Sequence, residues 1–390
     1  MAAVGEMQVP LPPSQDGSQA QVTPDSTSSQ SASNAVDLAT PAGVAIYLAS
    51  TEFAAADVKT LSGGNLGFTY RVLLKDTGTR KSVVVKHSLG YACSDANVVC
   101  TPERMAFEYE ALTTIARSEL VTPESVVQVP RVLLYDPSAY VLILEDLAPA
   151  LPLSSVLLEA FQNGTIESKS MKIGAALGDF IGRLHSWSAL PEQASTRERF
   201  SQNVASKESI PRVWYGEMIK SAKQYGLYMR WMDEFAEQRM RDAQAGGNVV
   251  IMGDFWVENI LVSPGPEFHL YVIDWEMARC ANPEVDVGYF AGALHSISYI
   301  NRPASSSFRF MESFIQSYNQ HFSVDEVRIA FAAGLYVMSF GPIMSWGAPW
   351  DVTNEKEVVE YGLGLLQAGV EGQVQKIRQN PIVRSMYTPS

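Results

Sequence analysis

The segment Met252-Gly-Asp-Phe-Trp-Val-Glu-Asn259, followed by Ile273-Asp-Trp-Glu276, is the most specific pattern in this chain of 390 residues. It places Asp254 five residues before Asn259 and twenty residues before a second aspartate, Asp274. Runs of β-branched and other apolar residues flank these positions and predict three short strands, at residues 248–252, 260–262 and 270–273. The sequence therefore predicts polar side chains on a loop that short strands hold in place.

These residue types are the ones that phosphoryl transfer requires. A carboxylate receives the proton of the attacking hydroxyl group, while amide and carboxylate oxygens hold Mg²⁺ against the phosphates of a nucleotide. The spacing of Asp254, Asn259 and Asp274 is that of a kinase catalytic loop and its metal-binding aspartate. Glu276 is a candidate for a further metal-facing carboxylate. A polar surface turn and a strand-end cap would explain these residues singly, but their joint occurrence favours a catalytic site.

A glycine-rich stretch, Leu61-Ser-Gly-Gly-Asn-Leu-Gly67, precedes a run at residues 68–74 that predicts a strand. Because they have no Cβ atom, Gly63 and Gly64 would let backbone N–H groups approach phosphates, and Ser62 would add a hydroxyl group. A Gly-Gly hairpin turn without a ligand would have the same sequence, so both interpretations stay open.

Lys86 ends a second strand-like run, residues 82–86, where kinases carry the lysine that contacts the nucleotide phosphates. A solvent-facing lysine at a strand end is the plainer alternative. The helix predicted at residues 105–116 carries Glu108, the expected partner of the lysine, and a rival, Glu110. Because helical geometry points these two carboxylates in different directions, the sequence alone does not decide between them.

The run at residues 141–147 is typical of a strand that leads into a hinge between two lobes. Backbone groups near Glu145 and Leu147 would then bind the edge of an adenine ring, which requires no particular side chain. An ordinary strand with an acidic end is equally compatible with this sequence.

Several other residues allow both a functional and a structural interpretation. We expect Asp286 to hold the catalytic loop by hydrogen bonds rather than to react. His185, at the end of an amphipathic helical run, is expected to be structural. Four aromatic residues are candidates for an acceptor pocket, although core packing is the more common role for each of them: Trp187, Trp256, Tyr299 and Trp346.

The order of the predicted elements indicates an α+β fold with two lobes. Strands and one long helix within residues 41–147 predict a small β-rich N-lobe that binds nucleotide, with further strands at 129–135 and 140–144. Helical periodicity, as in residues 214–244, dominates residues 148–380 and predicts a larger, mainly helical C-lobe with the catalytic loop and the acceptor site. Residues 1–40, rich in Ser, Gln and Pro, and residues 381–390 are expected to be tails.

Composition excludes several classes of function. A net charge of −13 argues against nucleic acid as a partner, because phosphate backbones require a basic face. The three cysteines lack metal-ligand spacing and indicate a reducing compartment without a disulfide framework. No Lys or Arg precedes Lys59, so no secretory or transit signal is predicted and a cytoplasmic location is expected. The uncharged run between Arg328 and Asp351 is interrupted by Gly and Pro, so we interpret it as a buried helix and turn rather than a membrane span.

Together these segments resemble the aminoglycoside phosphotransferase and choline kinase-like family of small-molecule kinases. The residues of these motifs are most similar to those of methylthioribose kinase-like fungal enzymes, a group that includes hydroxytryptamine kinases. The matching segments span roughly residues 44–370 and are Leu61-Ser-Gly-Gly64, Val85-Lys-His87, Gly253-Asp-Phe-Trp256, Asn259-Ile-Leu261, Ile273-Asp-Trp-Glu276, Asp286-Val-Gly-Tyr-Phe290 and Trp346-Gly347. Two positions depart from the family. Met252 stands where many relatives have His, and Gly67 stands where methylthioribose kinases tend to have Asn, which argues against that substrate.

The resemblance implies a bilobed protein-kinase-like fold and ATP- and Mg²⁺-dependent phosphorylation of a hydroxyl group on a small molecule, such as an amine-bearing alcohol or a secondary-metabolite intermediate. It implies that Asp254 is the base and that Asn259 and Asp274 are metal ligands. Lys86 would contact the α- and β-phosphates, with Glu108 as its partner. No obligate protein partner is evident.

Two alternatives remain at this point. A non-catalytic pseudokinase that binds nucleotide or a partner protein would lack catalytic residues, and none of the expected residues is missing. A kinase that acts on proteins is less compatible with the long, helical stretch between Leu147 and Asp254, which suits an elaborated site for a small acceptor.

Overall fold

The computed structural model of the chain describes residues 36–61, 64, 66–76, 78–163, 166–265, 267–300, 309–344 and 352–387. Most of the predicted N-terminal tail lies outside these residues, as do Ser62, Gly63 and Trp346. The chain divides into two compact units. The first holds the described residues up to Pro102 and Leu133–Asp146, and the second holds Glu103–Val132 and the residues from Leu147 onward. The long helix that we assigned to the N-lobe therefore belongs to the second unit.

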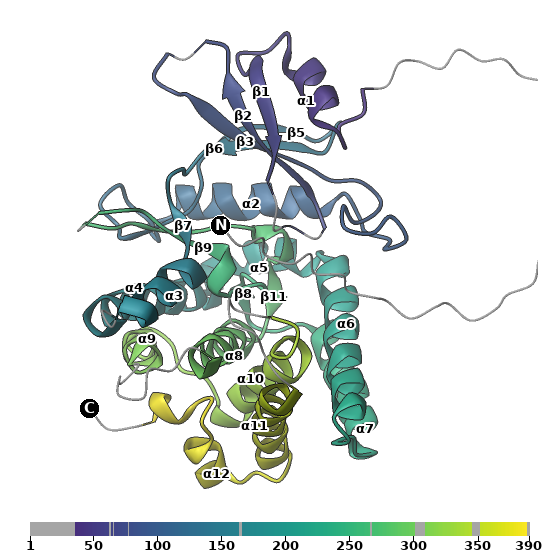
Figure 1. Cartoon of the computed structure of the whole chain (residues 1–390), viewed down its shortest axis with the longest axis vertical. Coiled ribbons are helices and arrows are strands. Elements are labelled where there is room, and N and C mark those ends of the chain that lie inside the picture. The colour runs from purple at the N-terminus through teal and green to yellow at the C-terminus, as the bar shows by residue number, and fades with distance from the viewer. Residues whose placement is uncertain are drawn as a thin grey trace, which may run out of the picture. The chain divides into compact units, whose positions relative to one another are not determined.

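The first unit is a five-stranded sheet of order β1-β2-β3-β6-β5 with helix α1 packed on it (Figure 1). Its elements are α1 (Pro41–Leu48), β1 (Ala55–Thr60), β2 (Phe68–Leu74), β3 (Ser82–His87), β5 (Val132–Asp136) and β6 (Val141–Glu145). Side chains alternate between the two faces of a strand, so that β3 buries Val83, Val85 and His87. Val44 and Leu48 of α1 complete this apolar core.

The predicted strands of this unit agree with the structure at three places and differ at two. The runs at residues 68–74, 82–86 and 140–144 form β2, β3 and β6. The strand expected at 129–135 begins only at Val132, because Val127 and Gln128 form β4 (Val127–Gln128) and pair with β10 of the second unit. β1 was not predicted, since its sequence, Ala-Ala-Asp-Val-Lys-Thr, has little apolar alternation; this edge strand is held by antiparallel pairing with β2.

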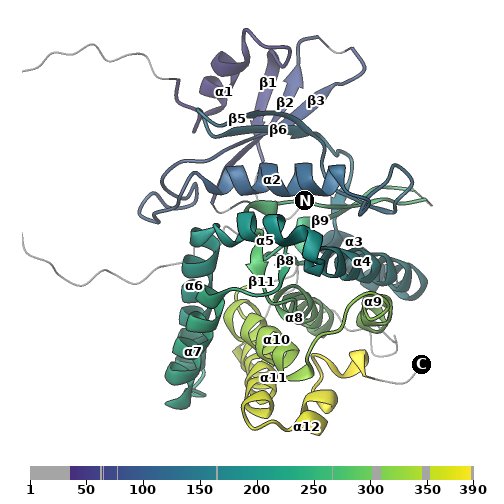
Figure 2. The same ribbon diagram turned by 180° about the vertical axis from the view of Figure 1, so that it is seen from behind.

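The second unit is mainly helical (Figures 1 and 2). Its helices are α2 (Arg104–Arg117), α3 (Leu153–Asn163), α4 (Ile166–Ala189), α5 (Ala194–Ser201), α6 (Val204–Gln224), α7 (Trp231–Ala245), α8 (Glu284–Ile300), α9 (Phe310–Tyr318), α10 (Glu326–Phe340), α11 (Val352–Val370) and α12 (Val374–Gln379). Two small sheets, of order β4-β10-β9-β7 and β11-β8, contain β7 (Leu151–Pro152), β8 (Val249–Ile251), β9 (Ile260–Val262), β10 (Leu270–Val272) and β11 (Arg279–Ala281). Together with the sheet of the first unit, this confirms the α+β class.

The helical region predicted at residues 214–244 is two helices, α6 and α7, which lie side by side in both views (Figures 1 and 2). The chain leaves α6 after Gln224 and passes Gly226, whose φ of 70° is easily adopted only by a residue without a Cβ atom. The charged and aromatic composition of the region predicted helix correctly, but the position of the break depends on this local backbone conformation.

Helices α4 and α9 approach closely because a stripe of glycines on α4 faces α9. A Cβ atom added to Gly178 would lie 2.0 Å from the carbonyl oxygen of Phe314, and one added to Gly182 would lie 2.9 Å from that of Tyr318. Gly174, four residues earlier, meets α9 in the same way. Residues four apart share one face of a helix, so the three glycines form a continuous contact surface.

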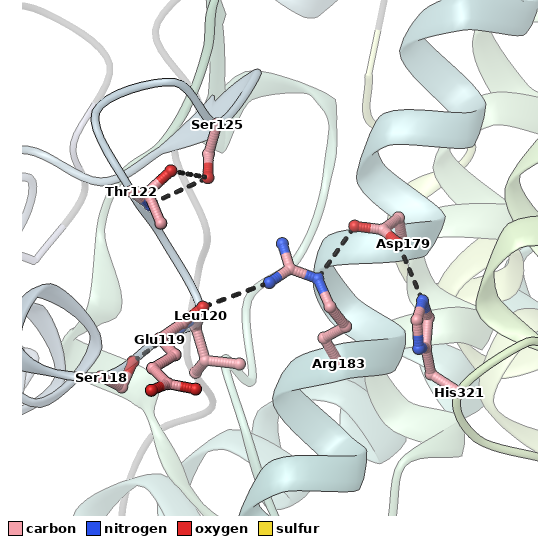
Figure 3. Close-up of polar contacts among 8 residues, drawn as sticks. All are labelled: Ser118, Glu119, Leu120, Thr122, Ser125, Asp179, Arg183 and His321. Carbon is pink, nitrogen blue, oxygen red and sulfur yellow. Dashed lines mark hydrogen bonds and ion pairs between the residues drawn. The ribbon is translucent and has the colours of Figure 1, made fainter.

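A chain of polar contacts joins α4 to two neighbouring segments (Figure 3). His321, which follows α9, lies with its Nε2 atom 2.8 Å from Asp179 Oδ1 on α4. Arg183 donates through Nε to Asp179 Oδ2 at 2.9 Å, and through Nη1 to the carbonyl oxygen of Glu119 at 3.5 Å. Because these side chains are partly exposed, each ion pair contributes on the order of 1 kcal/mol or less.

None of the described helices is long and apolar enough to cross a membrane. The uncharged run after Arg328 contributes most of α10, whose residues are largely buried, and the rest of that run at residues 345–351 lies outside the described part. Cys93, Cys100 and Cys280 are free thiols.

Candidate active site

The catalytic-loop segment, residues 252–259, runs from β8 to a 3₁₀ turn that ends at Asn259, and β9 follows directly. β9 pairs with β10 in antiparallel fashion, and Ile273 N donates to Asn259 O at 2.9 Å, immediately before Asp274. Asn259 Nδ2 donates to Asp254 Oδ2 at 2.8 Å and to the carbonyl oxygen of Asp254 at 3.0 Å. The three residues that the motif predicted are thus brought together by one hairpin and one turn.

Gly253 gives the loop a backbone conformation that other residues rarely adopt. Its φ is 82°, and a Cβ atom at this position would lie 2.5 Å from both Met277 O and Arg279 Nη1. The glycine before Asp254 is therefore required both by its dihedral angle and by the space available.

Asp286 of α8 is completely buried and holds the backbone of the loop. Its carboxylate accepts hydrogen bonds from Met252 N and Gly253 N, both at 2.9 Å. His185 Nε2 lies 3.2 Å from Asp286 Oδ2, and His185 Nδ1 lies 2.9 Å from the hydroxyl oxygen of Tyr318. Because a carboxylate accepts, Nε2 donates to Asp286, and in this tautomer Nδ1 accepts from the hydroxyl group of Tyr318. These contacts agree with a loop-holding role for Asp286 and a structural role for His185.

Asp254 has a carboxyl group that is easily protonated. Desolvation by burial raises its pKa to about 7, and the nearby charge of Asp274 is the next largest cause of the increase. The hydrogen bond from Asn259 acts in the opposite direction, and Glu276 adds a smaller increase. A carboxylate with a pKa near neutrality is suited to accept the proton of an alcohol.

Three carboxylates converge near the loop and form an acidic cluster: Glu108 of α2, Asp274 and Glu276. One oxygen of each lies within 4.8 Å of the others. Asp274 has a left-handed backbone conformation, with φ 67°, of the kind that concentrates at functional sites. Like charges this close repel one another unless a cation intervenes, and carboxylate oxygens are ligands that Mg²⁺ takes. The donor set fits this cation, and Asn259 has its Oδ1 atom available because Nδ2 is bound to Asp254.

Arg104 is a buried cation beside the acidic cluster that no sequence motif indicated. Its Nε atom lies 2.8 Å from Glu276 Oε2, and the two side chains are 3% and 10% exposed. On the same helix, Glu108 is buried, whereas Glu110 is partly exposed and lies 3.9 Å from Arg199. The helix therefore turns Glu108, and not Glu110, into the cluster.

The predicted phosphate-binding residues of the first unit lie before β2 and on β3. Ser62 and Gly63 fall outside the described residues. A Cβ atom on Gly64 would make only ordinary contacts, the nearest at 3.6 Å from Gly67 O, so no steric demand for glycine is evident there. Lys86 is half-buried on β3 and lies in register between β2 and β6. Its pairing with Glu108 would join the two units and stays a prediction.

The predicted hinge begins at the end of β6. Glu145 is the last residue of this strand, and Leu147 is the first residue of the second unit in this part of the chain. Between them, Asp146 has a nearly buried side chain that lies 2.8 Å from Arg71 Nε and accepts a hydrogen bond of 2.7 Å from Ser82 Oγ. This contact ties the end of β6 to β2 and β3. Sequence reasoning missed it because its partners are far apart along the chain.

An aromatic cluster of four residues from α6, α8 and α10 contains two tyrosines on which the charge of Asp254 acts. Trp214 stacks on Tyr289 with ring centroids 3.9 Å apart, and Phe340 and Tyr336 contact Trp214 at 4.5 and 5.7 Å. Burial raises the pKa of both tyrosines, and the charge of Asp254 adds to the effect in each case. Sequence reasoning missed this cluster, because aromatic residues at helical spacing resemble ordinary core residues.

The four aromatic residues proposed from the sequence are dispersed. Trp256 is half-buried in the catalytic loop itself. Trp187 lies on α4 and lines a surface cavity of about 570 Å³ together with α2 residues. Tyr299 donates a hydrogen bond to Glu357 of α11, and Trp346 lies outside the described residues.

Residues 57–327 match the phosphotransferase enzyme family. The chain is 24% identical to the 4-hydroxytryptamine kinase of Psilocybe cubensis, over 82% of this chain and 91% of that protein. It is 26% identical to the 4-hydroxytryptamine kinase of Psilocybe cyanescens, over 86% and 92%. Among solved structures, the macrolide 2′-phosphotransferase of Brachybacterium faecium is similar with a TM-score of 0.44 and 15% identity, over 89% of this chain and 98% of that one. This structural likeness is too distant to support an argument.

The family match covers more than half of the chain, including both aspartates of the motif. It confirms the resemblance that the motifs indicated and the prediction of an enzyme that transfers phosphoryl groups. The chain belongs to the phosphotransferase enzyme family.

Proposed function

We propose that this protein uses ATP and Mg²⁺ to phosphorylate the hydroxyl group of a small aromatic molecule that carries an amine. The observation that supports this most directly is the carboxylate of Asp254, hydrogen-bonded to Asn259 at 2.8 Å and close enough to Asp274 for that charge to raise its pKa. Phosphoryl transfer depends mainly on positioning and on neutralisation of charge, and these residues are arranged for both.

Each predicted site residue has one role in this proposal. Asp254 orients the acceptor hydroxyl and receives its proton. Asn259, Asp274 and Glu276 hold the metal, which when bound supplies positive charge against the phosphates. The nucleotide is held by the remaining residues, through the glycine-rich segment, the lysine with its glutamate and the hinge backbone: Ser62, Gly63, Gly64, Lys86, Glu108, Glu145 and Leu147.

The nature of the acceptor follows from the aromatic cluster and from charge. Trp214, Tyr289 and Tyr336 are buried, and the charge of Asp254 acts on both tyrosines, so the base would lie beside an aromatic wall that suits an aromatic amine. The net charge of −13 also favours a cationic substrate. The Psilocybe relatives are named for a hydroxylated indole amine, which has both properties. We further propose that the protein acts in the cytoplasm without an obligate protein partner.

The test is ATP consumption by the purified protein with Mg²⁺, across acceptors that include hydroxyindole amines, choline, ethanolamine, methylthioribose, homoserine and aminoglycosides. We expect turnover with an aromatic amine and a loss of about 10³-fold in kcat for Asp254→Asn. Asp57→Asn is the matched control, because that side chain is 51% exposed on the first unit. Near-normal turnover in Asp254→Asn would contradict the assignment of the base.

The same experiment tests whether the protein only binds nucleotide. Generic protein acceptors are included in the panel. Saturable binding of Mg·ATP without turnover on any small-molecule or protein acceptor would favour a non-catalytic role. Turnover on aliphatic amines alone would leave the catalytic assignment intact and contradict the role of the aromatic cluster.

A further inference from the structure

A cavity of about 400 Å³ lies in the second unit behind the catalytic loop, and of its lining residues only Tyr289 has a role in the function proposed above. Residues of α6, α7, α8, α10 and β11 line it. Its position relative to the loop follows from Arg279, which lines the cavity and whose Nη1 atom would lie 2.5 Å from a Cβ atom on Gly253. The volume is within the range of sites that bind small molecules.

Arg279 is a buried cation without a carboxylate at ion-pair distance among the described residues. It is 3% exposed, and its Nη1 atom donates to Ser206 Oγ at 2.9 Å and to Met277 O at 3.3 Å. Burial lowers the pKa of its guanidinium group, and the charges of Tyr289, Asp286 and Asp254 only partly offset this effect. A buried charge that is not directly paired is unfavourable, and an anion beside it would remove much of that cost.

Two tyrosine hydroxyl groups on the cavity also lack partners. Tyr215 is 8% exposed and Tyr289 is 6% exposed, yet within the described part of the chain neither hydroxyl makes a hydrogen bond with the protein. The pKa of Tyr215 is raised mainly by burial, and the charges that also act on it belong to cavity residues: Tyr289, Arg239, Asp242 and Glu284. Its hydroxyl oxygen therefore lies on the cavity side. Both hydroxyl groups line the cavity without a protein partner among the described residues, so they are available to donate hydrogen bonds to a ligand there.

The other charges on the cavity wall compensate one another. Arg239 Nη2 lies 2.6 Å from Asp242 Oδ2, and Arg328 Nη1 lies 3.3 Å from Glu284 Oε1. Arg279 is therefore the cation in excess. The remaining wall is partly apolar and includes Pro211, Phe331 and Leu335.

We propose that this cavity binds a small organic anion, a carboxylate or phosphate monoester on a flat apolar body. The anionic group is held by the guanidinium of Arg279 and the hydroxyls of Tyr215 and Tyr289. The apolar body packs against Phe331 and Leu335. The Nη1 atom of Arg279 lies beside Gly253. The bound anion therefore lies next to the loop that carries Asp254.

The test is calorimetric titration of the purified full chain with three probes, namely benzoate, inorganic phosphate and benzamide. We expect benzoate to bind and the isosteric neutral benzamide to bind at least tenfold more weakly. Phosphate binding tighter than benzoate would assign the phosphate class, and the reverse order would assign the carboxylate class with an apolar body. Equal affinity for benzoate and benzamide would overturn the proposal, because the cavity would then select shape and not charge.

Substitutions decide whether the anion occupies this cavity. Arg279→Met should weaken benzoate binding by about a hundredfold, and Tyr215→Phe and Tyr289→Phe by about tenfold each, since hydrogen bonds to charged groups have this strength. The tyrosine variants keep the shape of the side chain and remain informative if Arg279→Met does not fold. Arg241→Met, on α7 with a side chain 60% exposed, is the matched control and should bind normally. Affinity unchanged in all three cavity variants, or lost in Asp254→Asn instead, would overturn the proposal.

Discussion

Two polar regions lie against the catalytic loop, and they differ in how completely their side chains are hydrogen-bonded. On one side, Tyr318, His185 and Asp286 form an unbroken chain that ends on two backbone N–H groups of the loop. On the other side, among the described residues, the hydroxyls of Tyr215 and Tyr289 have no protein partner although both residues are buried. A saturated network fixes a backbone in one position, whereas an unsaturated one retains the capacity to bind a ligand.

The largest effect is expected from replacement of Asp286, which ends the hydrogen-bonded chain at the backbone of the loop. Asp286→Ala would leave Met252 N, Gly253 N and His185 Nε2 without an acceptor in a fully buried place. We expect a loss of about 3–5 kcal/mol in the free energy of unfolding, measured by urea denaturation, together with a large fall in kcat. Asp57→Ala, at an exposed position, should change stability by no more than about 0.5 kcal/mol. A loss below 1 kcal/mol for Asp286→Ala would show that the network does not hold the loop.

A smaller loss is expected where the two regions meet at the loop. Gly253→Ala forces a side chain into a φ of 82° and against Met277 O, and should cost at least about 2 kcal/mol. Gly216→Ala is the matched control, because a Cβ atom there meets nothing within 4 Å in α6 and should stabilise the protein by about 0.5–1 kcal/mol. Equal stability of the two variants would contradict the requirement for glycine at position 253.

Removal of the Tyr318 hydroxyl group from the hydrogen-bonded chain is expected to have a moderate effect on stability. Tyr318→Phe removes the donor to His185 Nδ1 and leaves a buried acceptor without a partner. The expected loss is about 1–1.5 kcal/mol, measured in the same urea titration. No loss would indicate that the ring of His185 is held by packing alone.

The smallest effect on stability is expected from removal of the Tyr215 hydroxyl group, which has no protein partner among the described residues. Tyr215→Phe removes a hydroxyl that bonds to no protein group, so in the absence of a ligand the free energy of unfolding should change by less than about 0.5 kcal/mol. This variant and Tyr318→Phe delete the same atom from two buried tyrosines, and their difference measures the contrast directly. A loss as large as that of Tyr318→Phe would mean that the Tyr215 hydroxyl already has a partner of similar strength.

The proximity of Asp254, Asn259 and Asp274 could be predicted from the sequence, because these residues lie within a short stretch of chain. Asp254 and Asn259 are joined by one turn, and Asp274 follows one hairpin later. Arg104 was not predicted, because its partner, Glu276, is far along the chain and nothing local marks a buried arginine.

The same reason limited the prediction of the fold. β2 and β3 have strong apolar alternation and were found, whereas β1 is an edge strand that depends on pairing with β2 rather than on its own side chains. The cavity behind the loop was also missed. Its cation and its two hydroxyls come from β11, α6 and α8, and no local pattern connects these three elements.

The glycine stripe of α4 has a consequence for hydrogen bonding. His185 follows Gly182 by three residues on α4, and Tyr318 on α9 is the residue whose carbonyl oxygen Gly182 faces. The spacing between the two helix backbones therefore determines whether the imidazole and the phenol can reach one another. The glycines of α4 thus set the length of the hydrogen bond between His185 and Tyr318. His185 also contacts Asp286, which accepts a hydrogen bond from the backbone of the catalytic loop. A methyl group added at Gly178 would push α9 away from α4 and lengthen the contact between His185 and Tyr318. The position of the loop that carries Asp254 would then change without any change to a polar residue.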